Sequence, residues 1–112
     1  MLVKTPEPPY VVIIFTNLKS DEANKAGKAY AVTAARMVEL AHEQDGFLAF
    51  ESATGEDGVT IANSYWRDEE AALAWKRNAE HLAAQKLGRE KWYQAFTLRV
   101  ATVTRAYGYE RA

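Results

Sequence analysis

Apolar residues along this chain follow two different spacings, and the changes between them divide the sequence into strands and helices. The run Tyr10–Phe15 is apolar without interruption, which is typical of a strand covered on both faces. Phe47–Ser52 and Val59–Trp66 predict two further strands, joined by a hairpin loop at Gly55–Gly58 whose residues tolerate positive φ. A long last strand, rich in Val, Thr and Tyr, is expected over Phe96–Tyr107.

Helical spacing of three and four fills the gap after the first strand. The apolar positions with this spacing are Tyr30, Ala34, Met37, Leu40 and Ala41. Ser20 offers an N-cap followed by acidic residues, but Gly27 weakens that start, so the helix begins either there or nearer Lys28. Asp45-Gly46 is expected to end it, with the glycine in a left-handed conformation.

A second helix is expected between the third and fourth strands. Asp68, Glu69 and Glu70 open it with the negative charge that a helix N-terminus favours. Its apolar positions are Ala72, Trp75, Ala79 and Leu82, and Gly88 ends it.

The predicted order of elements is β-α-β-β-α-β. This is the split βαβ pattern of the ferredoxin-like α+β fold, an antiparallel sheet with two helices on one face. Three prolines make residues 1–9 an extended leader, and residues 10–112 are expected to form a single domain.

Two features of this sheet predict a homodimer. Both faces carry apolar side chains, although two helices can cover only one of them. The last strand would extend about 40 Å, so one end should overhang the domain and expose unpaired backbone groups. A second subunit related by a twofold axis would cover both.

Composition excludes several classes of function. The 112 residues are 48% hydrophobic and 26% charged, with a net charge near −1 and no basic stripe, so nucleic acid is not an expected partner. Cysteine is absent and there are only two histidines, so no zinc site is expected. No apolar run approaches the roughly 18 residues of a membrane span. The leader lacks a signal-peptide core, so a cytoplasmic location without membrane contact is expected.

An ordered series of short segments runs through most of the chain. The segments are Arg36-Met37 with Leu40-Ala41, Asp45 to Leu48 with Glu51-Ser52, Asp57-Gly58 to Ser64-Tyr65-Trp66, Trp75-Lys76 with Glu80-His81, Trp92-Tyr93, and Arg99 to Tyr107. In this series the chain resembles the antibiotic biosynthesis monooxygenase family of the dimeric α+β barrel superfamily. The resemblance implies a barrel built from two subunits' sheets and, in each subunit, a cleft between helices and sheet.

The resemblance also implies two kinds of chemistry. Some relatives oxidise polycyclic aromatic substrates with O₂ and no flavin or metal, and others bind and degrade haem. The haem-degrading branch has an Asn and a Trp where this chain has Asn17 and Trp75, but its essential His falls about one turn beyond His81, at Gln85. The cofactor-free branch has a Trp at Trp66, preceded by an Asn at a spacing of four residues.

In this chain Asn63 precedes Trp66 by three residues, and an odd offset puts the two side chains on opposite faces of a strand. We therefore expect a cleft lined by Phe15, Asn17, Trp66 and Trp75 that accepts a small aromatic or quinone-like molecule. Asn17, Trp75 and His81 are the candidate catalytic residues. Each of the aromatic residues could equally be core packing, and His81 a solvated or capping residue.

The predicted function is a monooxygenase that needs no cofactor. A haem-binding or haem-degrading protein and a non-catalytic binding module for small ligands remain the alternatives.

Charged residues inside apolar strands form a separate group. Glu51 lies between Ala49 and Ala53 on its own face, and a buried carboxylate there needs a partner. Arg99 and Arg105 share one face of the last strand, so either could pair with it, within a subunit or between subunits. A clamp for an anionic substrate is the alternative.

Overall fold

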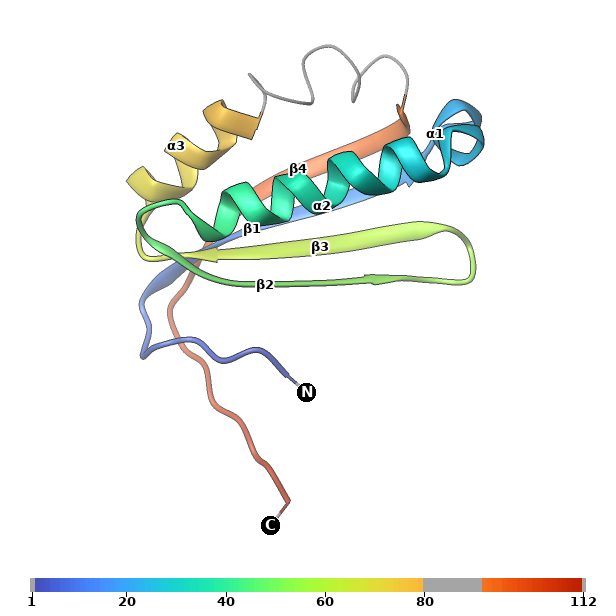
Figure 1. Ribbon diagram of the computed structural model, residues 1–112. Helices are drawn as coiled ribbons and strands as arrows, with labels where there is room; N and C mark the ends of the chain where they lie inside the picture. The colour runs from blue at the N-terminus through green and yellow to red at the C-terminus, as the bar shows by residue number, and fades with distance from the viewer. Residues whose placement is uncertain (1, 80–91, 112) are drawn as a thin grey trace.

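The computed structural model describes residues 2–79 and 92–111. Seven elements lie in these ranges: β1 (Tyr10–Lys19), α1 (Asp21–Ala26), α2 (Lys28–His42), β2 (Phe47–Thr54), β3 (Val59–Trp66), α3 (Glu69–Ala79) and β4 (Tyr93–Val103). The strands form one antiparallel sheet in the order β2-β3-β1-β4, which confirms the predicted ferredoxin-like α+β fold. Helices α2 and α3 lie on the same side of the sheet, and the two terminal segments extend on the other side (Figure 1).

The first predicted helix is divided into two. One part, α1, begins after Ser20, and the other, α2, begins at Lys28, so both predicted starts occur. Ser20 caps α1, its Oγ accepting a hydrogen bond of 3.1 Å from the Ala23 N–H. Gly27 separates α1 from α2 with a φ of 51°, a conformation that glycine adopts without steric cost.

Gly46 explains how the chain passes from α2 to β2. Its φ is 86°, and a Cβ at this position would lie 2.7 Å from the Cβ of Ala71 in α3. Its carbonyl accepts a hydrogen bond of 2.7 Å from the Arg67 N–H. The glycine therefore allows the α2–β2 connection to lie directly against the start of α3.

The sheet strands differ from the predictions mainly at their ends. β3 has the predicted bounds, β1 and β2 extend further, and β4 begins three residues earlier and ends at Val103 instead of Tyr107. Val103 pairs with Tyr10, the first residue of β1, so the residues that follow have no strand beside them. The predicted end of the second helix at Gly88 lies outside the described residues.

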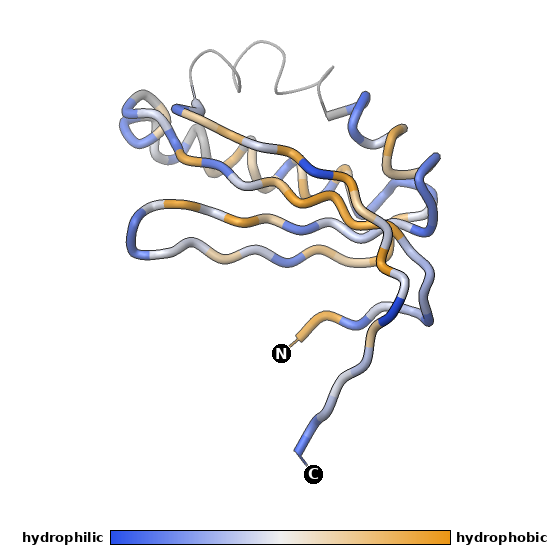
Figure 2. The backbone as a smooth tube through the Cα atoms, turned by 180° about the vertical axis from the view of Figure 1, so that it is seen from behind, coloured by the Kyte–Doolittle hydropathy of each residue, from blue (hydrophilic) through white to orange (hydrophobic). Residues whose placement is uncertain are grey.

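Side-chain alternation gives the sheet two different faces. Odd-numbered residues of β1 point toward the helices, where Val11 and Ile13 form the core with helix residues and Trp66. Hydrophobic residues follow the central strand β1, whereas the β2–β3 turn is hydrophilic (Figure 2). We call the side away from the helices the open face. None of the described helices is both long enough and apolar enough to span a membrane.

Candidate functional site

Two tryptophans form the centre of the core between helices and sheet. The Trp66 side chain is completely buried, and its Nε1–H donates a hydrogen bond of 2.9 Å to the Ser64 Oγ. The Trp75 ring from α3 stacks on it, with ring centroids 5.8 Å apart and an interplanar angle of 23°, and Phe47 meets Trp66 edge-on. With both ring faces and the indole N–H in use, Trp66 packs α3 onto the sheet.

A second aromatic group lies further along the same face of the sheet, toward the end of β1. Asn17 and Phe96 are directly opposite each other on β1 and β4, and Phe15 lies two residues before Asn17. The Phe15 ring contacts Tyr93 at 5.3 Å and Phe96 at 5.5 Å between centroids. We call Phe15, Asn17, Tyr93 and Phe96 the Asn17 cluster.

The amide of Asn17 is the unusual group in this cluster. The residue is 5% exposed, and its buried Oδ1 has no hydrogen-bond partner among the described residues. Leaving a buried acceptor unpaired costs about 1–3 kcal/mol, so such groups are rare in folded proteins, and a functional role is one reason for a protein to keep one. Phe96 is 42% exposed, so the cluster extends to the molecular surface. A ligand hydroxyl placed against the rings could supply the missing hydrogen bond.

The structure separates the residues that were predicted to line one cleft. Trp66 pairs with Val11, six residues before Asn17 on β1, which corresponds to about 20 Å along the strand. Phe15 and Asn17 therefore form one group, and Trp66 and Trp75 form another. Leu98 adjoins both groups, because it lies opposite Phe15 and packs against the tryptophan core. His81 lies outside the described residues.

A polar group also interrupts the open face. The Tyr65 hydroxyl donates a hydrogen bond of 2.6 Å to Glu51 Oε2, and the Tyr65 ring meets Tyr10 edge-on at 6.0 Å. Thr5 Oγ1 donates to the Tyr10 hydroxyl at 2.9 Å, which holds the leader against the same face. Burial, and then the hydrogen bond and charge of Glu51, raise the pKa of Tyr65 to about 12.

Asn63 lies on the open face beside this group. It pairs with Ile14, whereas Trp66 pairs with Val11, so Asn63 and Trp66 point to opposite faces as their odd spacing predicts. The buried Asn63 Oδ1 also lacks a hydrogen-bond partner among the described residues. Within the described residues, each face of the sheet thus has a buried amide oxygen without a hydrogen-bond partner, Asn17 on the helix side and Asn63 on the open face.

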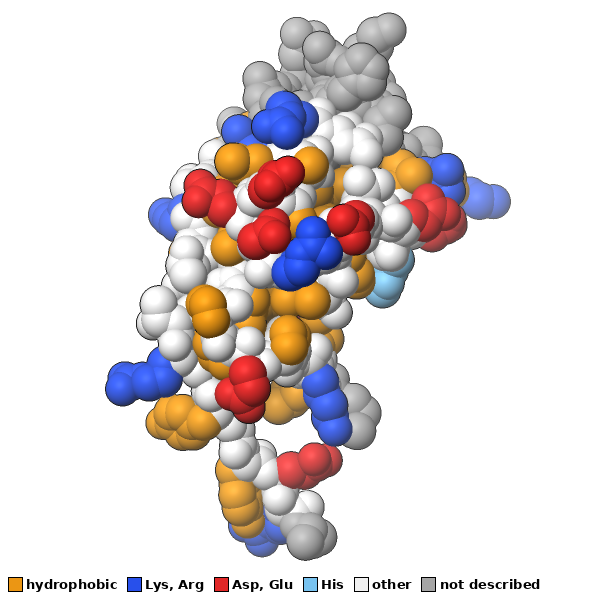
Figure 3. Space-filling model, turned by 90° about the vertical axis from the view of Figure 1, so that its left-hand side faces the viewer, with side chains coloured by type: hydrophobic (Ala, Val, Ile, Leu, Met, Phe, Trp, Pro, Cys, Tyr) orange, Lys and Arg blue, Asp and Glu red, His pale blue; other side chains and the backbone are white. Residues whose placement is uncertain are grey.

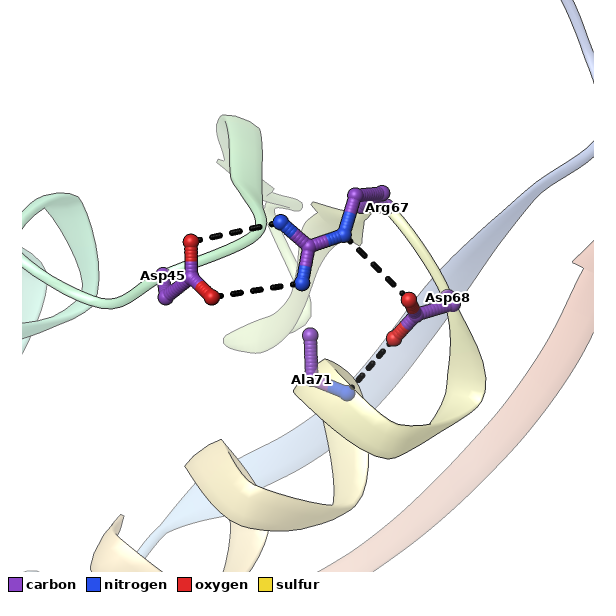
Figure 4. A network of polar contacts seen from close by, with 4 residues as sticks. All are labelled: Asp45, Arg67, Asp68 and Ala71. Atoms are coloured by element: carbon purple, nitrogen blue, oxygen red, sulfur yellow. Dashed lines mark hydrogen bonds and ion pairs between the residues drawn. The ribbon is translucent and has the colours of Figure 1, made fainter.

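Arg67 forms ion pairs with Asp45 and Asp68 (Figure 4). Arg67 donates two hydrogen bonds to Asp45, of 3.2 and 3.3 Å, and one of 3.2 Å to Asp68, which accepts from the Ala71 N–H at 2.8 Å. The Arg67 hydrogen bond and charge lower the pKa of Asp45. Acidic and basic side chains lie next to one another on one side of the molecule (Figure 3). Arg67 thus links the loop before β2 to the start of α3.

The second histidine and the remaining carboxylates supply no metal site within the described ranges. His42 is exposed, with its ring 4.5 Å from that of Phe47. Among residues 2–79 and 92–111, no three His, Cys, Asp or Glu side chains lie close enough to hold a metal ion.

Two members of the Asn17 cluster, Tyr93 and Phe96, were not among the residues predicted to line the cleft. The signal for Phe96 was available in the alternation of the last strand, since Phe96, Leu98 and Val100 share one face. Tyr93 lies before the predicted start of the last strand at Phe96, although it is the first residue of β4.

Comparisons with known proteins agree with this architecture. The sequence model of a family described as antibiotic biosynthesis monooxygenase matches residues 9–87. The uncharacterized protein YqjZ of Bacillus subtilis is 47% identical over 104 residues, which are 93% of this chain and 88% of that protein. Jasmonate monooxygenase ABM of Pyricularia oryzae is 38% identical over 47 residues, 42% of this chain but only 22% of that protein.

Solved structures share the fold at low sequence identity. SnoaB of Streptomyces nogalater, a cofactor-independent oxygenase, has a TM-score of 0.62 and 14% identity to this chain. The match covers 90% of this chain and 97% of SnoaB. At this identity the likeness demonstrates a common fold and leaves the chemistry to the side chains.

Proposed function

The chain belongs to the antibiotic biosynthesis monooxygenase family, and from that membership we propose that it is a monooxygenase that needs no cofactor. Its substrate is a small phenolic or quinone-like aromatic compound bound at the Asn17 cluster. The observation that carries this proposal is the buried Oδ1 of Asn17, which has no hydrogen-bond partner among the described residues and lies beside Phe15 and Phe96.

The cluster suits a flat molecule that carries a hydroxyl group. Aromatic rings bind a flat ligand by edge-on and offset contacts, while one amide oxygen accepts a hydrogen bond and fixes the ligand's orientation. Asn17 would act by positioning, because a neutral amide does not take up a proton at physiological pH.

The proposed reaction converts a ring CH₂ group next to a phenol, as in an anthrone, into a ketone. One oxygen atom of O₂ becomes the ketone oxygen, and the other leaves as water with the two hydrogens of the CH₂ group. Electrons come from the two C–H bonds that break, so no external reductant is required. The SnoaB fold likeness and the jasmonate monooxygenase match are consistent with this reaction class.

The test measures oxygen consumption with a hydroxylated anthrone, and binding of hydroxylated naphthoquinones by tryptophan fluorescence. Asn17→Ala should reduce ligand affinity about tenfold, which corresponds to the loss of one hydrogen bond. Asn63→Ala is the matched control, since it removes a buried amide from the other face of the sheet, away from the Asn17 cluster. Equal behaviour of Asn17→Ala and the parent protein toward every aromatic ligand would falsify the proposal.

Hemin is titrated in parallel. A stoichiometric shift of its Soret band that is lost in His81→Ala would replace this proposal with haem binding. Binding of naphthoquinone without any oxygen consumption would indicate a ligand-binding module.

We also propose that the protein works as a homodimer joined through the open face. Ile61 on that face is 48% exposed, and its neighbours across the ladder are apolar or small. Beyond β4 the chain continues past the sheet as an arm in which Tyr107 is 98% exposed (Figure 1). Large apolar groups in such positions are typical of surfaces that associate.

A further inference from the structure

Four residues form a straight row across the open face, one from each strand. Glu51 of β2 pairs with Asn63 of β3, Asn63 pairs with Ile14 of β1, and Ile14 pairs with Arg99 of β4. Directly paired residues point to the same side of a sheet. The row therefore carries a negative charge on one edge strand and a positive charge on the other.

The two charges cannot meet within one subunit. They are separated by three strand spacings, about 14 Å, which is several times the length of an ion pair. Glu51 instead accepts the Tyr65 hydroxyl through one of its oxygens, Oε2. This corrects the expectation of a Glu51 ion pair inside the subunit. Arg99 is exposed and forms no ion pair with any described residue.

At the β2 end of the row, Glu51 and Asn63 offer oxygens that can accept hydrogen bonds from an arginine. Glu51 provides a carboxylate, and Asn63 on the next strand provides a buried oxygen that has no hydrogen-bond partner among the described residues. A guanidinium group carries five N–H donors and no acceptor, so one arginine can satisfy both residues.

We propose that Glu51 and Asn63 of one subunit bind Arg99 of a second copy, an inference that rests on the homodimer proposed above. A twofold axis parallel to the strands, between β1 and β3, lays β2 of each copy over β4 of the other. Because all four residues lie in one row, Glu51 then faces Arg99 of the second copy. The symmetry produces this contact twice, and the two contacts set the register of the interface.

The other way of facing the two sheets is disfavoured by charge. A twofold axis across the strands would lay β2 over β2 and β4 over β4. Glu51 would then approach its own copy, as would Arg99, and like charges directly opposite one another destabilise a packed surface. The leader covers the Tyr10 end of the open face. The second copy therefore contacts the rest of that face, between the row that contains Ile14 and the β2–β3 turn.

Charge reversal tests the contact. Glu51→Arg alone and Arg99→Glu alone each put like charges together at both contacts, and each should raise the dimer dissociation constant at least about a hundredfold. An equimolar mixture of the two variants restores opposite charges at both contacts. The mixture should form a heterodimer within about tenfold of the parent affinity, as measured by sedimentation velocity and by native mass spectrometry.

Arg105→Glu is the matched control, since it makes the same charge change outside the row. It should leave the parent dimer intact and should bind Glu51→Arg no more tightly than the parent protein does, because position 99 is still arginine in this variant. If Glu51→Arg does not fold, Arg99→Glu and Arg99→Gln still decide the question, because Arg99 is exposed and its replacement does not disturb the core.

The outcomes separate this inference from the dimer itself. A monomeric parent protein overturns both, and the open face then belongs to another partner. A dimeric parent whose Arg99→Glu variant dimerises equally well keeps the dimer and overturns the Glu51–Arg99 contact. Rescue of Glu51→Arg by Arg105→Glu would show that Glu51 contacts Arg105, in the segment after β4, and would overturn the contact with Arg99.

Discussion

The Tyr65 hydroxyl donates a hydrogen bond of 2.6 Å to Glu51 across the β2–β3 hairpin, and this contact holds a polar group on the open face. The two residues are diagonal neighbours, because Glu51 pairs with Asn63 and Tyr65 lies two residues further along β3. The hydrogen bond is short, as expected for a hydroxyl that donates to a carboxylate.

Removing this hydrogen bond should destabilise the fold modestly. Tyr65→Phe keeps the ring against Tyr10 but leaves Glu51 without its donor, and we expect the free energy of unfolding to fall by about 1–2 kcal/mol. Urea unfolding measures the loss. Glu51→Gln and the double variant complete a cycle, in which a coupling energy near zero would show that the two side chains act independently.

The same tyrosine predicts a loss of stability at high pH. Its pKa is raised to about 12 in the folded protein and is near 10 when unfolded, so folding favours the protonated phenol. The resulting stabilisation is complete below about pH 10 and is lost as the pH rises toward 12. Urea midpoints should therefore fall more steeply across this range in the parent protein than in Tyr65→Phe. Parallel curves would mean that the phenol titrates normally.

Gly46 should tolerate no side chain. Gly46→Ala forces a positive φ on alanine and brings its Cβ to 2.7 Å from that of Ala71, and we expect a loss of about 2–4 kcal/mol. Gly27→Ala is the matched control, since its φ is also positive but no atom lies within 4 Å, so a loss of about 1 kcal/mol is expected. Thermal unfolding compares the two, and equal losses would show that backbone strain alone decides.

Local signals predicted most of this fold, and the errors come from contacts between distant segments. The bounds of β3 were correct because a turn and an acidic helix start flank it. The end of β4 was wrong because it depends on where β1 begins, which the β4 residues do not encode. Likewise, the spacing of α3 predicted that Trp75 faces the sheet, but its position along the sheet comes from packing against Trp66. For this reason Asn17 and Trp66 were placed in one cleft, although the register separates them.

The partner of Glu51 was missed for a related reason. A carboxylate inside an apolar strand predicts a partner of opposite charge, so an arginine was expected. The register of the β2–β3 hairpin instead places the Tyr65 hydroxyl next to Glu51. Inside the subunit, Glu51→Ala therefore removes the acceptor of a phenol hydrogen bond and leaves no buried arginine unpaired. A loss of about 3 kcal/mol, typical of a broken buried ion pair, is expected only from the dimer contact with Arg99.

The proposed homodimer should have twice the mass of one chain in solution. If the open face joins two copies, sedimentation velocity at micromolar concentration should give one species of twice the chain mass of 12.6 kDa. Ile61→Lys places a charge on that face and should shift the protein toward monomer. Leu73→Lys is the matched control on the outer side of α3, where leucine is also exposed and the mass should not change. A species of 12.6 kDa in the parent protein would contradict the prediction.

Replacing Asn17 should raise the stability of the fold and weaken ligand binding. Its buried Oδ1 is unpaired among the described residues, so Asn17→Leu removes a desolvated polar group and places an apolar side chain of similar size beside Phe15 and Phe96. We expect the free energy of unfolding to rise by about 1 kcal/mol, while affinity for hydroxylated naphthoquinones falls about tenfold or more. A residue that served only packing would lose stability on this change and would leave ligand affinity unaltered. Asn63→Leu provides the comparison, because it replaces a buried amide on the open face, away from the Asn17 cluster, and should leave naphthoquinone binding as in the parent. Urea unfolding and fluorescence titration of both variants therefore decide whether the Asn17 amide is kept for a ligand.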